Sequence, residues 1–135
     1  DSVPKAGVET LIWISLEPRD RSWLHQRIAL RFKHMLKRGL LDEVSALMAQ
    51  EKMHASLPSM RAVGYRQCLQ WLLGQADQGS SLEEQGIAAT RQFAKRQLTW
   101  LRAMPQRQVF ACDDSSELSR AQQRLEQALA SAATA

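Results

Sequence analysis

The sequence predicts an α/β fragment that is predominantly α-helical. Apolar side chains recur at helical spacing along most of the 135 residues, as they do at Leu24, Ile28 and Phe32. Two short, mostly apolar runs, 11–16 and 108–112, have instead the length and composition of strands. Two such strands, far apart in the sequence, rarely form a stable sheet by themselves. We therefore expect both to join a sheet whose other strands lie upstream of this chain.

The first half of the chain is predicted to contain one strand and two helices. The run 11–16 is the expected strand, and Asp20 is placed to cap the N-terminus of a helix that continues to about Arg38. Gly39 is expected to end that helix, because glycine accepts the left-handed conformation found after a C-terminal turn. A second helix follows, and its apolar residues at helical spacing are Leu40, Val44, Leu47 and Met48.

The second half begins with an interruption at Pro58, followed by a short helix over 64–73. Ser81 and Glu84 have the spacing of a capping box, in which each residue satisfies a backbone N–H of the other, and they open a long helix. Pro105 stops that helix. The run 108–112 is the second expected strand, and a terminal helix follows, with apolar residues at Leu118, Leu125 and Leu129.

The composition is that of an ordinary globular protein. The chain is 44% hydrophobic and 24% charged, and its net charge of +4 permits an anionic partner without requiring one. No apolar run approaches the roughly 18 residues of a transmembrane helix, and no signal peptide is recognisable. Cys68 and Cys112 have neither metal-ligand spacing nor paired histidines, so we predict no metal site and expect two buried thiols in a reducing cytoplasm.

The most informative segment is the part of the long helix at 90–102. Its cations at Arg91, Lys95 and Arg102 fall within about 40° of one another, so they share one side. The opposite arc is apolar and includes Phe93 and Trp100, which predicts a buried face. Gln97 projects from the middle of that arc, where a buried amide needs a hydrogen-bond partner in the protein or in a ligand. The alternative is a surface helix with ordinary salt-bridging cations.

Two further pairs of arginines lie at positions suited to anions. Arg27 and Arg31 are one helical turn apart, and Arg31 lies at the edge of the predicted buried stripe, where a guanidinium needs a carboxylate or phosphate partner. Arg61 and Arg66 flank Gly64 at a predicted helix start, where free backbone N–H groups attract phosphate. The respective alternatives are an internal ion pair and a simple turn with solvated arginines.

These segments closely resemble the tRNA dimethylallyltransferase family, whose members prenylate an adenosine beside the tRNA anticodon. The matching motifs are LHQRIALRFKHMLKRGLLDEV at 24–44, LPSMRAVGYRQ at 57–67 and TRQFAKRQLTWLR at 90–102. The resemblance runs from about Thr10 to the final helix and covers only the C-terminal portion of such an enzyme. It implies a P-loop-type α/β core upstream, which carries the P-loop and an aspartate general base. No glycine here is followed by the lysine of a P-loop.

The resemblance also implies roles for individual residues. Arg31 matches an arginine implicated in catalysis that contacts the pyrophosphate of dimethylallyl pyrophosphate, and Arg27 can reach the same anion. Mg²⁺ is expected to be held mainly by the missing N-terminal part and by the donor pyrophosphate. No membrane or protein partner is implied. The residues that match segments contacting the tRNA anticodon stem-loop are Arg61, Gly64, Tyr65, Arg66, Lys95, Arg96, Gln97, Thr99 and Arg102.

Residues 1–135 are therefore predicted to be the C-terminal portion of a tRNA dimethylallyltransferase. We expect this portion alone to be inactive, because the P-loop and the general base are absent from it. For Tyr65 and Trp100, packing in the core is favoured over stacking on a base. Two rival interpretations remain: a non-catalytic, basic helical RNA-binding module, and a structural helical interaction domain whose cations are merely solvated.

Overall fold

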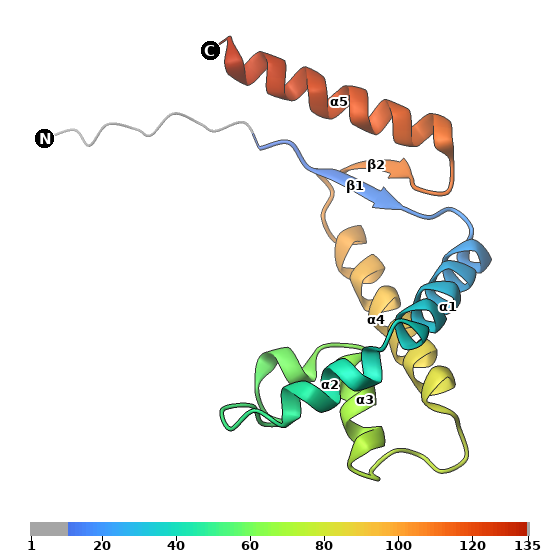
Figure 1. Cartoon of the computed structure of the whole chain (residues 1–135). Coiled ribbons are helices and arrows are strands. Elements are labelled where there is room, and N and C mark those ends of the chain that lie inside the picture. Colours follow the sequence, from blue (N-terminus) through green and yellow to red (C-terminus); the bar gives the residue numbers. More distant parts are fainter. Residues whose placement is uncertain (1–10, 135) are drawn as a thin grey trace, which may run out of the picture. The chain divides into compact units, whose positions relative to one another are not determined.

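The computed structural model describes residues 11–134, and these form two units (Figure 1). The first ten residues of the predicted 1–135 portion, with Thr10 among them, and Ala135 lie outside that range. One unit, mainly helical, holds Asp20–Thr99. The other contains the chain up to Arg19 and from Trp100 onward. The sequence did not indicate this division. Its second boundary, between Thr99 and Trp100, falls within a helix.

The helical unit has five elements, and its core lies among all of them. In chain order these are α1 (Arg21–Lys37), α2 (Leu40–Met48), a 3₁₀ turn η1 (Pro58–Arg61), α3 (Tyr65–Leu72) and α4 (Leu82–Arg102), whose last turn belongs to the other unit. The predicted interruption at Pro58 is this 3₁₀ turn, with proline at its first position. The buried residues that form the core are Phe32, Leu40, Val44, Met60, Cys68, Leu69 and Leu82.

The ends of the helices follow the predicted capping chemistry. The Asp20 carboxylate accepts the backbone N–H of Ser22 at 2.8 Å and begins α1. Gly39 follows α1 with φ +100°, as expected of a left-handed residue at a helix end. At the start of α4, Ser81 N–H donates to Glu84 Oε2 at 2.8 Å, and Glu84 N–H donates to Ser81 Oγ at 3.2 Å. The predicted capping box is confirmed.

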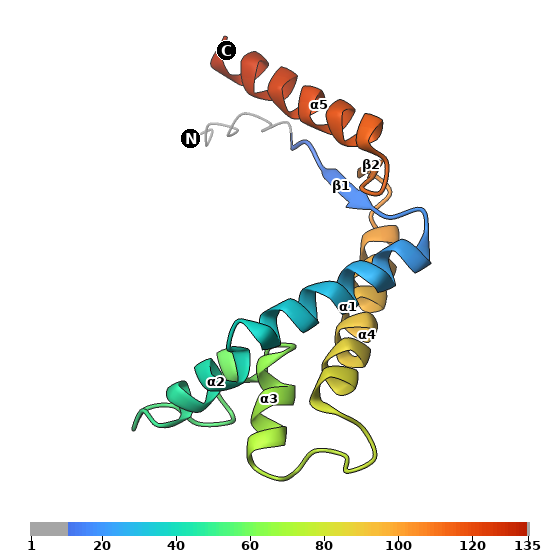
Figure 2. The same cartoon turned by 45° about the vertical axis from the view of Figure 1, so that its right-hand side comes forward.

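A glycine lets α4 approach α1 closely at the point where the two helices cross (Figure 1, Figure 2). The ring of Phe32, only 1% exposed, lies over Gly86. A Cβ atom at Gly86 would lie 1.9 Å from Phe32 Cζ, far inside a normal carbon contact of about 3.5–4.0 Å. The contact therefore has no room for any side chain at position 86.

The other unit pairs the two predicted strands with each other. β1 (Ile14–Glu17) and β2 (Gln108–Ala111) form a parallel sheet of two strands, with Ile14 opposite Gln108. The strand expected at 11–16 thus begins and ends later, because pairing with β2 sets its limits. α5 (Ser115–Ala133) packs against both strands. A mostly helical fragment with two strands is confirmed, while further strands upstream stay a prediction.

A largely buried ion pair joins the end of β1 to the segment just before β2. Arg107 Nε lies 2.6 Å from Glu17 Oε1, and Ser15 Oγ donates to the same carboxylate oxygen at 2.8 Å. Glu17 is only 8% exposed. The hydrogen bond from Arg107 holds the pKa of Glu17 below its usual value, although burial opposes this shift. Glu17 is therefore ionised at neutral pH, and it is the last residue of β1, one position beyond the predicted end of the strand.

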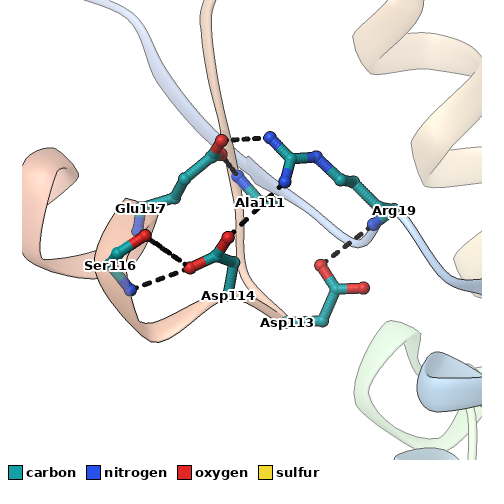
Figure 3. Close-up of polar contacts among 6 residues, drawn as sticks. All are labelled: Arg19, Ala111, Asp113, Asp114, Ser116 and Glu117. Carbon is teal, nitrogen blue, oxygen red and sulfur yellow. Dashed lines mark hydrogen bonds and ion pairs between the residues drawn. The ribbon is translucent and has the colours of Figure 1, made fainter.

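Arg19 ties the segment after β1 to the start of α5 (Figure 3). Its backbone N–H donates to Asp113 Oδ1 at 3.0 Å, and its guanidinium contacts Asp114 at 3.5 Å and Glu117. Glu117 also accepts the backbone N–H of Ala111, while Asp114 caps α5. One arginine thereby fixes the turn between β2 and α5.

No helix within residues 11–134 is long and apolar enough to span a bilayer.

Candidate nucleic-acid interface

Arg27 and Arg31 lie on one open face of α1, and all the residues that line this face belong to that helix. The Arg27 guanidinium lies 5.6 Å from the centre of the Trp23 ring, a cation–π distance. The other lining residues are Leu24, Ile28, Leu30 and His34. The prediction that Arg31 is half-buried is wrong, because this residue is exposed.

This face of α1 combines free positive charge with apolar surface. None of the ion pairs found among residues 11–134 includes Arg27 or Arg31, so the internal ion pair considered from the sequence is not formed there. Leu30 projects from the same face and is largely exposed. The arrangement suits a ligand that has both an anionic group and a small apolar group.

Arg61 and Arg66 line a cavity of about 380 Å³ in the same unit. Both side chains are exposed, and neither takes part in an ion pair within the described chain. Gly64 lies between them in the sequence, with φ +95°, a conformation that favours glycine. The structure therefore brings the two predicted arginines to one cavity. The other lining residues are Ala55, Ser56, Met60, Leu69, Gln70, Leu73 and Gln75.

Tyr65, the first residue of α3, has an internal partner. Its phenol hydroxyl donates to Glu43 of α2, and its ring packs against the core. The hydrogen bond to Glu43 raises the pKa of the Tyr65 phenol, with a smaller contribution from burial. Core packing, favoured from the sequence, is confirmed for this ring. Its hydroxyl is already occupied by a carboxylate.

α4 presents its cationic segment to solvent, but its apolar arc is not buried as predicted. Lys95 and Arg96 are exposed, as is Arg102 in the last turn. Phe93 is 41% exposed and Trp100 is 65% exposed. The expectation that both pack in a core is therefore wrong for this chain. The helix is fully covered near its start, where Gly86 meets Phe32, and only half-covered later, at Ala94, Leu98 and Leu101.

The two polar residues of the segment also differ from expectation. Gln97 is exposed, so the predicted buried amide does not exist in this chain and its side chain is available to solvent. The hydroxyl of Thr99 donates to the carbonyl oxygen of Lys95 at 3.0 Å, within the helix. Its oxygen still has a lone pair free to accept a hydrogen bond.

Two polar contacts near Gly64 were missed from the sequence. One is the bond between Glu43 and Tyr65, which joins residues 22 positions apart and depends on the packing of α2 against α3. The other is the side chain of Gln67, whose Oε1 accepts the backbone N–H of Gly64 at 2.8 Å. A signal for the second existed, because glutamine three residues after a helix cap is the second half of a capping box.

The described residues offer no centre for a metal ion. Among residues 11–134, no group of three or more His, Cys, Asp or Glu side chains is placed to hold one. Cys68 is buried in the core, and its desolvation raises the pKa of the thiol. The site as described is thus made of cations, amides and apolar surface.

A family model described as IPP transferase matches residues 3–104. This range includes α1, η1, α3 and α4, and with them the exposed cations Arg27, Arg31, Arg61, Arg66, Lys95 and Arg102. The chain belongs to the IPP transferase family. Among curated relatives, a tRNA dimethylallyltransferase of an Acidovorax species is 64% identical over 99 residues, covering 73% of this chain and 30% of the relative. That of Leptothrix cholodnii is 52% identical over 119 residues, covering 88% and 36%.

A solved structure has a similar fold. The full-length tRNA isopentenylpyrophosphate transferase from Bacillus halodurans superposes with a TM-score of 0.71 at 26% identity. The match covers 86% of this IPP transferase chain and 38% of that structure. The chain thus spans only about a third of the length of its relatives.

Proposed function

We propose that the protein containing this chain transfers a dimethylallyl group from dimethylallyl pyrophosphate to the exocyclic amine of the adenosine adjacent to the tRNA anticodon. The observation that carries the proposal is the match to the IPP transferase family over residues 3–104. The names of the curated relatives support transfer of a dimethylallyl group to tRNA, and the adenosine beside the anticodon is part of our proposal. Several exposed cations take part in none of the ion pairs found among residues 11–134, which supports a site for two anionic substrates; they are Arg27, Arg31, Arg61, Arg66 and Lys95.

Arg31 and Arg27 are proposed to hold the pyrophosphate. In the transfer, the bond between the prenyl carbon and the pyrophosphate oxygen breaks, and a bond forms between that carbon and the adenine nitrogen. The pyrophosphate leaves with the bonding electrons, so positive charge fixed beside it lowers the barrier. The proton of the amine passes to a base outside this chain. The apolar surface at Trp23 and Leu30 suits the prenyl group.

Among residues 11–134, no group of three or more His, Cys, Asp or Glu side chains is placed to hold Mg²⁺. We propose that the upstream part of the protein and the pyrophosphate itself hold the ion. Its chemistry there is to neutralise charge on the pyrophosphate. The arginines of α1 do not depend on it for their position, since α1 is anchored by its own cap and by core packing.

The tRNA is proposed to lie across the turn around Gly64, with Arg61 and Arg66, and across the part of α4 that carries Lys95. Arg61, Arg66 and Lys95 would bind phosphates, as guanidinium and ammonium groups do in protein–nucleic acid contacts. Gln97 is exposed and is able to donate to or accept from a nucleotide. The adenosine must leave its stack to be alkylated, so a cavity beside Arg61 and Arg66 suits the nucleotides near it.

A transfer assay tests this function directly. The full-length protein, given dimethylallyl pyrophosphate and tRNA, is expected to produce a prenylated adenosine beside the anticodon, while residues 1–135 alone are expected to produce none. Tight RNA binding by the full-length protein without any transfer would favour the RNA-binding module. Absence of both activities would favour a structural helical domain.

A further inference from the structure

We infer that Glu43 and Gln67 are positioning residues, which hold the start of α3 so that Arg61 and Arg66 face the RNA in a fixed geometry. Tyr65 then acts through its hydroxyl and Glu43, and not by stacking on a base. The inference rests on the proposed tRNA contact at these arginines. It assigns a function to two residues that bear no free positive charge and lie outside the predicted contact set.

The first contact joins α3 to its neighbouring helix. Glu43 lies in the first turn of α2, and its carboxylate accepts the hydroxyl proton of Tyr65 at the first position of α3. The Tyr65 ring is packed against the core, so it has little freedom to reorient. The hydrogen bond therefore fixes the rotation of α3 about its own axis relative to α2.

The second contact fixes the backbone just before α3. Gln67 Oε1 accepts the N–H of Gly64 at 2.8 Å, which holds a glycine in its left-handed conformation. The N–H of Arg66 donates to the carbonyl oxygen of Ala62 at 2.9 Å. The turn between the two arginines is thus held at both of its flanks. Glycine has the widest choice of backbone conformations, and the Gln67 contact narrows that choice at Gly64.

The benefit of such positioning is a smaller entropic cost of binding. Both arginines are exposed at one cavity, Arg61 at the end of the 3₁₀ turn η1 and Arg66 in the first turn of α3, and the chain between them forms a turn. A turn that is ordered before the RNA arrives loses less freedom on binding. The number of phosphates contacted stays the same, so positioning changes affinity without changing how affinity depends on salt.

The test uses the full-length protein and titration with an anticodon stem-loop RNA at several salt concentrations. Tyr65→Phe keeps the ring and removes only the hydroxyl, and Glu43→Ala removes its acceptor. Each is expected to raise Kd about fivefold or more, with the salt slope unchanged. The double variant is expected to be no weaker than either single variant, because both remove the same hydrogen bond.

Two variants serve as controls. Glu43→Gln keeps an acceptor for the Tyr65 hydroxyl and is expected to restore binding to within about twofold of the original protein. Asp42→Ala removes a neighbouring acidic side chain from the same turn of α2 and is expected to leave Kd unchanged, as the structure gives Tyr65 no contact with it. Gln67→Ala is expected to weaken binding as Tyr65→Phe does.

The outcomes separate this inference from the proposed function. Normal Kd in Tyr65→Phe, Glu43→Ala and Gln67→Ala would overturn positioning, even if melting temperatures fall. A flattened salt slope in Tyr65→Phe would also overturn it, since that result means a lost phosphate contact. The proposed RNA contact is tested independently by Arg61→Ala, which is expected to flatten the slope by about one unit.

Discussion

Replacing Gly86 with alanine tests the closest packing in the helical unit. The new Cβ would lie 1.9, 2.2 and 2.5 Å from three ring atoms of Phe32, so the ring or α4 must move by more than about 1 Å. Overpacking of this kind costs about 3 kcal/mol at the upper end of its usual range, because Phe32 is fully enclosed. Alanine offsets about 1 kcal/mol of this through its helix propensity. We expect a net loss of about 2 kcal/mol.

Urea unfolding followed by circular dichroism measures this loss, which corresponds to a midpoint shift of about 1 M for a typical slope. Gly79→Ala is the control, since a Cβ there makes only an ordinary contact of 3.5 Å with Asp77. It is expected to change stability by less than about 0.5 kcal/mol. If Gly86→Ala is as stable as the original protein, or more stable, the close approach of α4 to Phe32 is wrong.

Three further predictions follow from single contacts. Arg31→Ala in the full-length protein is expected to lower kcat/KM for the prenyl donor at least tenfold, about 1.4 kcal/mol, with tRNA affinity unchanged; normal donor kinetics would remove Arg31 from the pyrophosphate site. The Arg107–Glu17 pair contributes stability above the ordinary pKa of 4.5, and this contribution is lost as pH falls through the lower folded pKa of Glu17. Arg107→Met should therefore destabilise the protein at pH 7 and converge with it in acid, and a pH-independent difference would contradict this. Ser81→Ala should cost about 1 kcal/mol in urea unfolding through the lost cap of α4, and no change would contradict the capping box.

The sequence predicted the helix ends well because capping is local. Asp20, Gly39 and the pair of Ser81 and Glu84 each act on backbone groups within a few residues, so their pattern is sufficient evidence. The parallel pairing of β1 with β2 was not predictable in the same way, since the strands are about 90 residues apart. The Arg107–Glu17 pair beside these strands was not predictable either, because its two residues are 90 positions apart.

The candidate site was predicted less completely, for a different physical reason. Helical periodicity shows which residues share an arc, but not how far a neighbouring element covers it. Gly86 and Phe93 lie near the same side of α4, yet only Gly86 is covered in this chain. Gln97 is exposed because no neighbouring element covers this side of α4 either. The contact between Glu43 and Tyr65 depends on tertiary packing, which no local pattern encodes.

The central claim is that α4 contacts RNA phosphates through its exposed cations. The most direct test measures the salt dependence of stem-loop RNA binding by the full-length protein and by its Lys95→Ala and Arg102→Ala variants, with Arg120→Ala of α5 as a control for net charge. Each α4 variant is predicted to bind more weakly, with a salt slope flattened by about one unit, whereas Arg120→Ala keeps the original slope. Lys95→Ala removes a side chain that has no ion pair among residues 11–134, so it is also predicted to keep the original melting temperature. Unchanged affinity and slope in both α4 variants would contradict the account and leave this helix as scaffold.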